Sequence, residues 1–154
     1  MPLDTKSFDL FRTLPLDQAR LWHVLTDAKT REKWNGPDAS TLLVTDAADL
    51  QVGGVDRHRC GPVDAPEFVV ETRWYDLTEY DRAVFTETLI FGGAAVCTSL
   101  VTYVLDGKEN QTDLSITVAV SSFSGAETLA EVAQGWAGGM DNLEAFTKSM
   151  TQPI

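Results

Sequence analysis

Three polar residues alternate in one segment of the chain, and their spacing could build a site for chemistry. Asp56, His58 and Cys60 stand at every second position of a strand predicted at about 54–60. Successive side chains of a strand point to opposite faces, so these three residues share one face. Carboxylate, imidazole and thiol are groups that bind ligands and move protons. We expect this face to point inward.

A fourth polar residue is expected on the neighbouring part of the sheet. In the strand predicted at about 80–91, Glu87 interrupts a face that is otherwise apolar. A carboxylate on an inward face is costly unless it is paired or protonated. We therefore expect Asp56, His58 and Glu87 to form one inward polar cluster, to which Tyr103 could add a hydroxyl. A histidine beside carboxylates is expected to have a raised pKa.

Several uses of this cluster stay open. It could be a satisfied polar core, a ligand anchor, or an acid–base pair of His58 and Glu87. A register shift of one residue would instead turn Asp56 and His58 to solvent. The chain contains no CxxC or HExxH pair and no glycine-rich phosphate loop. We therefore expect no metal site and no nucleotide cofactor, and we expect the two cysteines to be inert thiols.

The elements that must position this cluster are predicted to be an antiparallel sheet. Short turns separate consecutive strand patterns, which favours a meander. Two short helices are expected after the first strand, at about 16–25 and from a cap at Asp27 through Trp34, where Gly36-Pro37 ends the second. The strands are predicted at about 6–13, 41–45, 54–60, 67–76, 80–91, 95–106 and 111–121.

A long amphipathic helix is predicted at the C-terminal end, to about residue 149. Its apolar residues, from Leu129 to Phe146, recur at helical spacing, and only the sheet is available for them to pack on. Trp136 and Met140 face the sheet, as core residues or as the floor of a pocket. Gly135, Gly138 and Gly139 each cost about 1 kcal/mol against alanine in an exposed helix. We expect them either to allow a close approach to the sheet or to leave room beside the helix.

Composition limits the partners of this chain. A length of 154 residues fits one domain, 1–154, and the formal net charge of −11 disfavours nucleic acid and anionic membranes. The short basic stretches are expected on solvated faces. No stretch approaches the roughly 20 apolar residues of a membrane span, and no signal peptide begins the chain, so we expect a cytoplasmic protein. The basic stretches are Lys29, Arg31, Lys33 and Arg57, Arg59.

An ordered set of short motifs resembles one known family. The motifs are Leu21-Trp22, Leu25-Thr26-Asp27, Trp34, Gly36-Pro37, the DLQVGG of 49–54, and Gly135-Trp136 with Leu143. Together they resemble START-like (SRPBCC) domains, in the branch named for the C-terminal domain of the heat-shock-protein ATPase activator. The resemblance implies an α+β helix-grip fold, in which a curved antiparallel sheet wraps a long C-terminal helix with a cavity between them. It implies ligand binding, transport or occasional catalysis.

Three functions follow from these expectations. The leading one is binding of a hydrophobic or amphipathic small molecule in the cavity, with contacts from Asp56, His58, Glu87, Tyr103, Trp136 and Met140. The second is a hydrolase, cyclase or isomerase that uses His58 with Glu87, which must then lie within hydrogen-bond reach. The third is a chaperone accessory or protein-interaction module, which predicts an exposed apolar patch in place of a cavity. In the activator itself a separate N-terminal domain supplies much of the chaperone contact, and we expect this chain to have no room for one. The sequence leaves a homodimer open.

Overall fold

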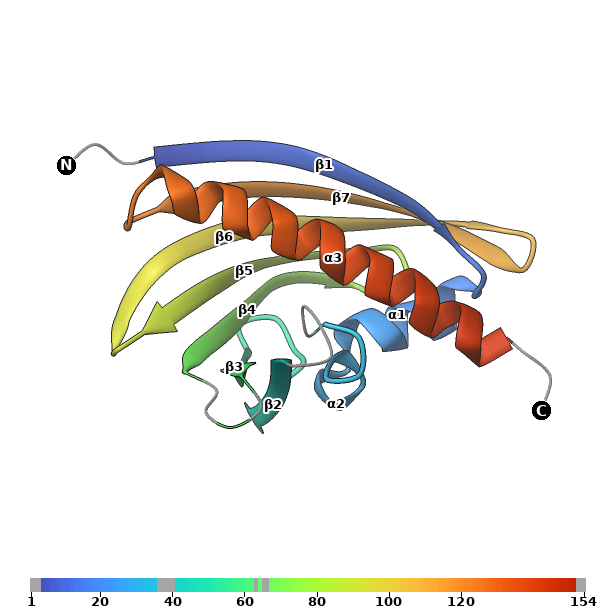
Figure 1. Ribbon diagram of the computed structural model, residues 1–154. Helices are drawn as coiled ribbons and strands as arrows, with labels where there is room; N and C mark the ends of the chain where they lie inside the picture. The colour runs from blue at the N-terminus through green and yellow to red at the C-terminus, as the bar shows by residue number, and fades with distance from the viewer. Residues whose placement is uncertain (1–3, 36–40, 63, 65–66, 152–154) are drawn as a thin grey trace.

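The fold is a curved seven-stranded sheet that wraps one long helix (Figure 1). The computed structural model describes residues 4–35, 41–62, 64 and 67–151. The strands are β1 (Asp4–Leu14), β2 (Thr41–Ala47), β3 (Val55–Pro62), β4 (Phe68–Thr78), β5 (Arg82–Phe91), β6 (Ala94–Lys108) and β7 (Gln111–Ser122), and the helices are α1 (Gln18–Thr26), α2 (Ala28–Arg31) and α3 (Ala126–Thr151).

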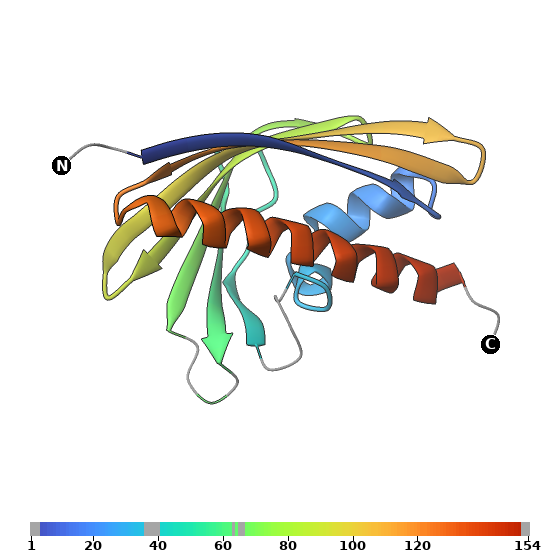
Figure 2. The same cartoon turned by 45° about the horizontal axis from the view of Figure 1, so that its top comes forward.

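The strands are arranged as the sequence predicts. The order is β1-β7-β6-β5-β4-β3-β2 and every neighbouring pair is antiparallel. Strands β2 to β7 therefore form a meander, and β1 pairs with β7 at the far edge. The helix α3 lies along the concave face, while α1 and α2 cover one end of it (Figure 2). This is the helix-grip arrangement, and the predicted fold class is confirmed.

The two short helices begin at aspartates. Asp17 caps α1 by accepting a hydrogen bond from the Arg20 backbone N–H at 2.9 Å, and Asp27 caps α2 by accepting one from that of Thr30 at 3.0 Å. The second helix ends at Arg31, earlier than predicted. Trp34 is nevertheless buried beyond its end and donates its indole N–H to the Val24 carbonyl oxygen at 3.0 Å. The predicted stop at Gly36-Pro37 lies outside the described residues.

A glycine pair shapes the entry into β3. Gly53 has a φ of +85°, in the left-handed region that favours glycine. A Cβ at Gly54 would lie 2.1 Å from the Asp49 carbonyl oxygen, so the approach of the two backbone segments requires glycine. The Asp49 backbone N–H in turn donates to the Asp56 carboxylate at 2.7 Å. The turn thus fixes the first polar residue of β3.

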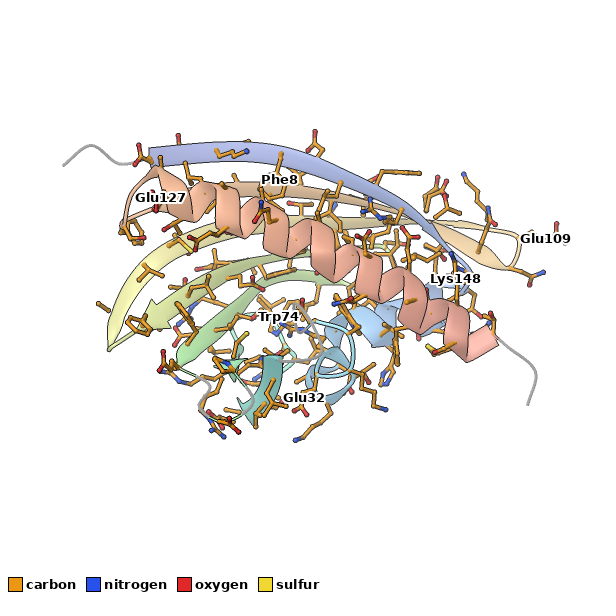
Figure 3. All side chains as sticks on the ribbon, in the orientation of Figure 1. Phe8, Glu32, Trp74, Glu109, Glu127 and Lys148 are labelled. Carbon is orange, nitrogen blue, oxygen red and sulfur yellow. The ribbon has the colours of Figure 1, made fainter. Side chains whose placement is uncertain are left out.

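The hydrophobic core fills one part of the concave face. Trp74, Phe85, Val101 and Val118 occupy one row across β4, β5, β6 and β7, and all of them are buried. Met140 and Leu143 from the C-terminal half of α3 belong to the same buried cluster. Side chains pack densely between α3 and this part of the sheet (Figure 3). The remaining part of the concave face is available to hold a site.

Candidate functional site

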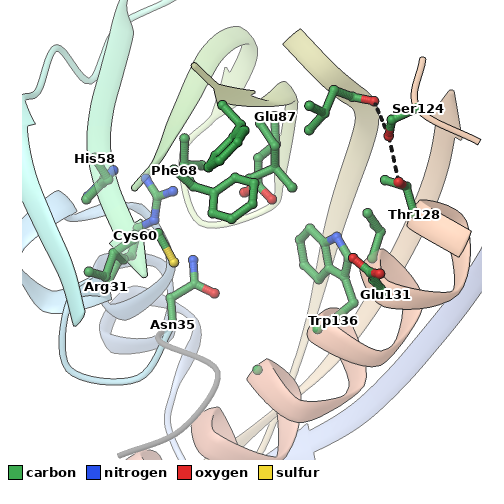
Figure 4. A pocket seen from close by; sticks show the side chains of 18 residues that line it. Arg31, Asn35, His58, Cys60, Phe68, Glu87, Ser124, Thr128, Glu131 and Trp136 are labelled. Atoms are coloured by element: carbon green, nitrogen blue, oxygen red, sulfur yellow. Dashed lines mark hydrogen bonds between the residues drawn. The ribbon is translucent and has the colours of Figure 1, made fainter. Parts of the chain in front are cut away.

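A pocket of about 360 Å³ lies between the N-terminal half of α3 and the sheet (Figure 4). Most of its wall is apolar. Phe68, Val70, Leu89 and Phe91 contribute from β4 and β5, and Val132 and Trp136 contribute from α3. The polar side chains at the wall are Arg31, Asn35, His58, Glu87, Ser124, Thr128 and Glu131. A mostly apolar concavity with a few polar groups is the usual form of a small-molecule site.

A row of polar side chains crosses the concave face beside this pocket. Asp56, Thr72, Glu87 and Ser99 stand opposite one another on β3, β4, β5 and β6. Asp56, Thr72 and Ser99 are buried and Glu87 is half-buried. We call these four residues the polar row. The inward facing that the sequence predicted for Asp56, His58 and Glu87 is confirmed.

Arg31 covers the polar row from α2. Its guanidinium donates to the Asp56 carboxylate at 3.2 Å and to the Thr72 hydroxyl at 3.3 Å. The guanidinium carbon also lies 5.8 Å from the ring centroid of Trp74. Only 4% of the Arg31 side chain is exposed. The prediction that this residue lies on a solvated face is therefore wrong.

The other residues of the two basic stretches are exposed, as expected. Lys29 pairs with Glu32, Arg57 with Glu71 and Arg59 with Asp46. Arg31 differs because it lies at the end of a helix that packs over the sheet, where it pairs with the buried Asp56. A sequence pattern of alternating charges does not distinguish these two situations.

His58 is fully buried at the wall of the pocket. Its Nε2 lies 3.4 Å from the Ala28 carbonyl oxygen, and its Nδ1 has no hydrogen-bond partner within the described part of the chain. A carbonyl oxygen only accepts, so we assign the ring proton to Nε2 and an unused lone pair to Nδ1. Burial and the nearby Arg31 charge lower the pKa of His58. The predicted rise is wrong, because these two effects outweigh the attraction of Asp56.

Glu87 stands at the pocket wall without a partner. Its carboxyl makes no hydrogen bond or ion pair with any residue between 4 and 151 that the structure describes. Burial raises its pKa, and the Arg31 charge opposes that rise only in part. Burial therefore makes ionisation of this carboxyl more costly than in water.

The structure keeps His58 and Glu87 apart. Glu87 aligns with Thr72 and Asp56, whereas His58 aligns with Val70 and Leu89. The two residues are thus two strands apart, about 10 Å across the sheet, and two positions apart along it, about 7 Å. Figure 4 shows them at different parts of the wall. The hydrogen-bonded acid–base pair that the enzyme hypothesis requires is not formed.

The four other residues expected to bind a ligand lie in different places. Trp136 lines the pocket. Tyr103 and Met140 are buried in the core and do not line it, and the Tyr103 ring contacts Phe85 and Trp136 with centroid distances of 5.1 and 6.3 Å. Burial also raises the pKa of Tyr103, which keeps its hydroxyl protonated. Asp56 lies behind the wall, where it acts on the pocket through Arg31.

The glycines of α3 leave room beside the helix. Gly135 and Gly139 line the pocket. A Cβ at Gly135 or Gly138 would meet nothing within 4 Å, and one at Gly139 would make an ordinary 3.6 Å contact with Asn35. A close approach to the sheet is therefore not the reason for these glycines. Of the two alternatives, the structure favours the one in which missing side chains create space.

The sequence interpretation missed Asn35, Thr128 and Glu131. Thr128 and Glu131 lie on the same helix stripe as Val132, Gly135 and Gly139. This stripe of small and polar residues has helical spacing and faces inward, which is a signal that the sequence contains. Asn35 carried no such signal, because it lies in the turn after α2.

The described residues also give information on metal binding, thiol chemistry and membrane insertion. Among them, no group of three or more histidine, cysteine, aspartate or glutamate side chains could hold a metal ion. Cys60 lies at the pocket wall and burial raises the pKa of its thiol, as it does for Cys97. No helix formed by the described residues is long and apolar enough to cross a membrane.

Known proteins resemble this chain over nearly its whole length. Residues 15–148 match the family model described as activator of Hsp90 ATPase homolog 1-like protein. No curated protein matches significantly. Solved structures share the fold. The Mll3558 protein of Rhizobium loti is 23% identical with a TM-score of 0.80, and 94% of this chain and 99% of that one are covered.

Two further solved structures are similar in the same way. The CV1439 protein of Chromobacterium violaceum is 19% identical with a TM-score of 0.79, and the match covers 92% of this chain and 96% of that one. A protein of Arthrobacter aurescens is also 19% identical, with a TM-score of 0.77 and coverage of 96% and 91%. At these identities the similarity shows the fold alone.

Proposed function

This chain belongs to the family of activator of Hsp90 ATPase homolog 1-like proteins, within the START-like superfamily, and we propose that it binds a hydrophobic or amphipathic small molecule in its pocket. The fold is compatible with ligand binding in such a cavity. The observation that carries the proposal is the combination of a mostly apolar wall with a few polar side chains, among them His58 and Glu87.

The size and composition of the pocket support this proposal. A volume of about 360 Å³ is at the lower end of the range for small-molecule sites. Apolar walls supply most of the affinity, and the few polar groups orient the ligand. Filling the pocket would also supply partners to groups that are costly to leave unpaired.

The other two functions find less support. The enzyme hypothesis depends on a His58–Glu87 pair, and the register separates these residues. The interaction hypothesis depends on an exposed apolar patch. Phe11 and Val104 are exposed on the convex face, but Ser115 stands between them on β7. Neither arrangement supports its function as directly as the pocket supports ligand binding.

A thermal-shift screen tests the proposal. The purified protein is heated in the presence of single compounds from a library of lipids and aromatic metabolites. A ligand at a hundred times its Kd stabilises the folded state by about 2.7 kcal/mol, which raises Tm by roughly 5–10 °C for a chain of this size. A library without any stabiliser contradicts the proposal, as does a stabiliser that acts equally on a variant with a filled pocket.

A further inference from the structure

The charges at the pocket wall are not balanced. The charged side chains among its described lining residues are Arg31, Glu87 and Glu131, and the His58 ring beside them is neutral. Arg31 is already paired with Asp56, which lies behind the wall. Glu87 and Glu131 form no ion pair with a residue in the described ranges. As far as the structure describes the wall, it offers two carboxyl groups and one cation that is already paired.

Among the residues that the structure describes, two polar groups at the pocket wall lack a hydrogen-bond donor, whereas the unpartnered indole N–H of Trp74 belongs to the core and lacks an acceptor. The Nδ1 atom of His58 presents a lone pair and has no donor among the described residues. The Glu87 carboxyl can accept hydrogen bonds through both oxygens once it is ionised. Both groups thus lack a hydrogen-bond donor. A ligand that carries N–H groups supplies what the wall lacks.

We propose that the occupant of the pocket is an amphipathic cation, an amine whose ammonium group lies against Glu87 and whose apolar part packs against Trp136, Phe68 and Phe91. This inference rests on the proposed function, since it names the class of ligand for the same pocket. It assigns Glu87 as the residue that selects the charge of the ligand.

The aromatic side chains of the pocket suit such a ligand. The rings of Phe68 and Phe91 pair with their centroids 5.0 Å apart, and Trp136 stands on the opposite wall (Figure 4). Aromatic faces attract cations through the ring quadrupole. The net charge of −11 also raises the concentration of cations near the protein.

An anionic ligand fits the same pocket less well. A carboxylate would lie near Glu87 and Glu131, and the arginine that could bind it already donates to Asp56 and Thr72. A ligand carboxylate at Arg31 would share that one positive charge with Asp56 and bring two carboxylates close together. We therefore expect the ligand preference to follow the order amine, neutral alcohol, carboxylate.

The binding of a cation at Glu87 must be coupled to the release of a proton from that carboxyl. Burial raises the pKa of Glu87, so its carboxyl holds its proton to a higher pH than a carboxyl in water does. An ammonium group binds the ionised form, and the proton leaves Glu87 to solvent. The affinity for the amine therefore rises about tenfold per pH unit below the pKa of Glu87 and is constant above it.

The ionisable groups around Glu87 should not mask the pH dependence of the affinity for the amine. Arg31 on α2 stays charged, and the lowered pKa of His58 on β3 keeps that ring neutral above its ordinary range. Burial raises the pKa of three further groups, so these stay neutral at physiological pH. They are Cys60 on β3 and Cys97 and Tyr103 on β6. Glu131 on α3 is exposed at the mouth of the pocket and serves as the control.

Three probes with one common body test the inference. They are 4-phenylbutylamine, 4-phenylbutan-1-ol and 4-phenylbutanoic acid, measured by isothermal titration calorimetry between pH 4 and pH 8, a range that begins below the ordinary Glu87 pKa of 4.5. At pH 8 we expect the amine to bind roughly tenfold to a hundredfold more tightly than the alcohol, as a charge-assisted hydrogen bond provides, and the acid to bind most weakly. The affinity for the amine should rise with pH, and that for the alcohol should not.

Two variants locate the selecting group. Glu87→Gln keeps the shape of the side chain and should abolish the preference for the amine over the alcohol. Glu131→Gln should change the affinity for the amine less than about threefold, because an exposed charge is screened by solvent. A preference that survives Glu87→Gln and disappears in Glu131→Gln contradicts the assignment to Glu87.

The outcomes separate the two proposals. Binding of the alcohol or the acid more tightly than the amine overturns the cation inference and leaves ligand binding in place. Failure of all three probes to bind contradicts both. An affinity for the amine that does not vary with pH in the wild-type protein overturns the proton-coupled binding at Glu87, independently of how the variants fold.

Discussion

The concave face of the sheet has a filled half and a hollow half, and the same strands pass through both. In the filled half, Trp74, Phe85 and Val101 meet Met140 and Leu143 of α3, and these side chains are buried. In the hollow half, the same strands present Val70 and Leu89 to a part of α3 that carries Gly135. The strands supply large side chains in both places, so the difference comes from the helix.

This comparison shows how one helix can provide both stability and a site. The C-terminal half of α3 brings Met140, Leu143 and Thr147 against the sheet, where none of them is exposed. The N-terminal half brings Thr128, Gly135 and Gly139 to the pocket. The polar row lies at the boundary, with Arg31 across it. Each half, and the boundary, can be altered separately.

The largest effect is expected at the boundary. Arg31→Ala leaves Asp56 buried without its partner, and we expect it to destabilise the protein by about 3–5 kcal/mol. Chemical denaturation of the purified variants measures this. The double variant Arg31→Met, Asp56→Leu should lose much less, because both charges are removed together. Equal losses in the single and double variants would show that the pair does not hold α2 over the sheet.

Truncation of leucine in each half sharpens the comparison directly. Leu143→Ala creates a cavity in the filled half and should cost about 3 kcal/mol, within the range known for buried leucines. Leu89 packs against the buried side chains of Cys97 and Val120 but also borders the pocket, so we expect Leu89→Ala to lose less, about 1 kcal/mol. Denaturation midpoints with unchanged slopes provide the test. A loss at Leu89 as large as that at Leu143 means that the hollow half is packed like the core.

Filling the hollow half should affect binding more than stability. Gly135→Leu gains up to about 1 kcal/mol from helix propensity, while its side chain takes up space in the pocket. Gly138 is a matched control, because it is on the same helix, has the same open surroundings and does not line the pocket. Gly138→Leu should be stabilised similarly and bind as the wild type does. Thermal shift with 4-phenylbutylamine compares them, and equal binding by both variants contradicts the position of the pocket.

The dependence of stability on pH probes the polar wall of the hollow half. The folded-state pKa of Glu87 is raised above its ordinary value of 4.5. Its contribution to stability is therefore fully present below pH 4.5 and is lost as the pH rises through the raised pKa. Glu87→Gln removes this loss, so the variant should gain stability relative to wild type between pH 4 and pH 8 without ligand. Denaturation at both pH values measures the difference, and a constant difference contradicts the shift.

His58 acts on stability in the opposite direction. Its folded-state pKa is lowered below 6.5, so the folded state loses stability as the pH falls from 6.5 through the lowered value. The two groups therefore oppose each other in neighbouring pH ranges. A Glu87→Gln variant isolates the His58 contribution on the acid side.

Much of the fold was predictable, because local patterns specify it. The alternation in β3 and β5 and the helical spacing in α3 are properties of short segments, and the structure confirms the elements and their order. The same alternation places Asp56 and His58 on one face of β3, and the structure turns that face inward. The placement of Arg31 was wrong because its neighbours along the chain are exposed, and only its neighbours in space are buried.

By itself the sequence determined which residues share a face on each element, since a strand repeats every two residues and a helix about every 3.6. Only the tertiary structure decided what each inward residue meets. It separated His58 from Glu87 through the strand register, covered Asp56 with Arg31, and left Gly135 opposite open space. These relations depend on contacts between segments that are distant along the chain. No local period records such contacts, and they are what makes one half of the face a core and the other a pocket.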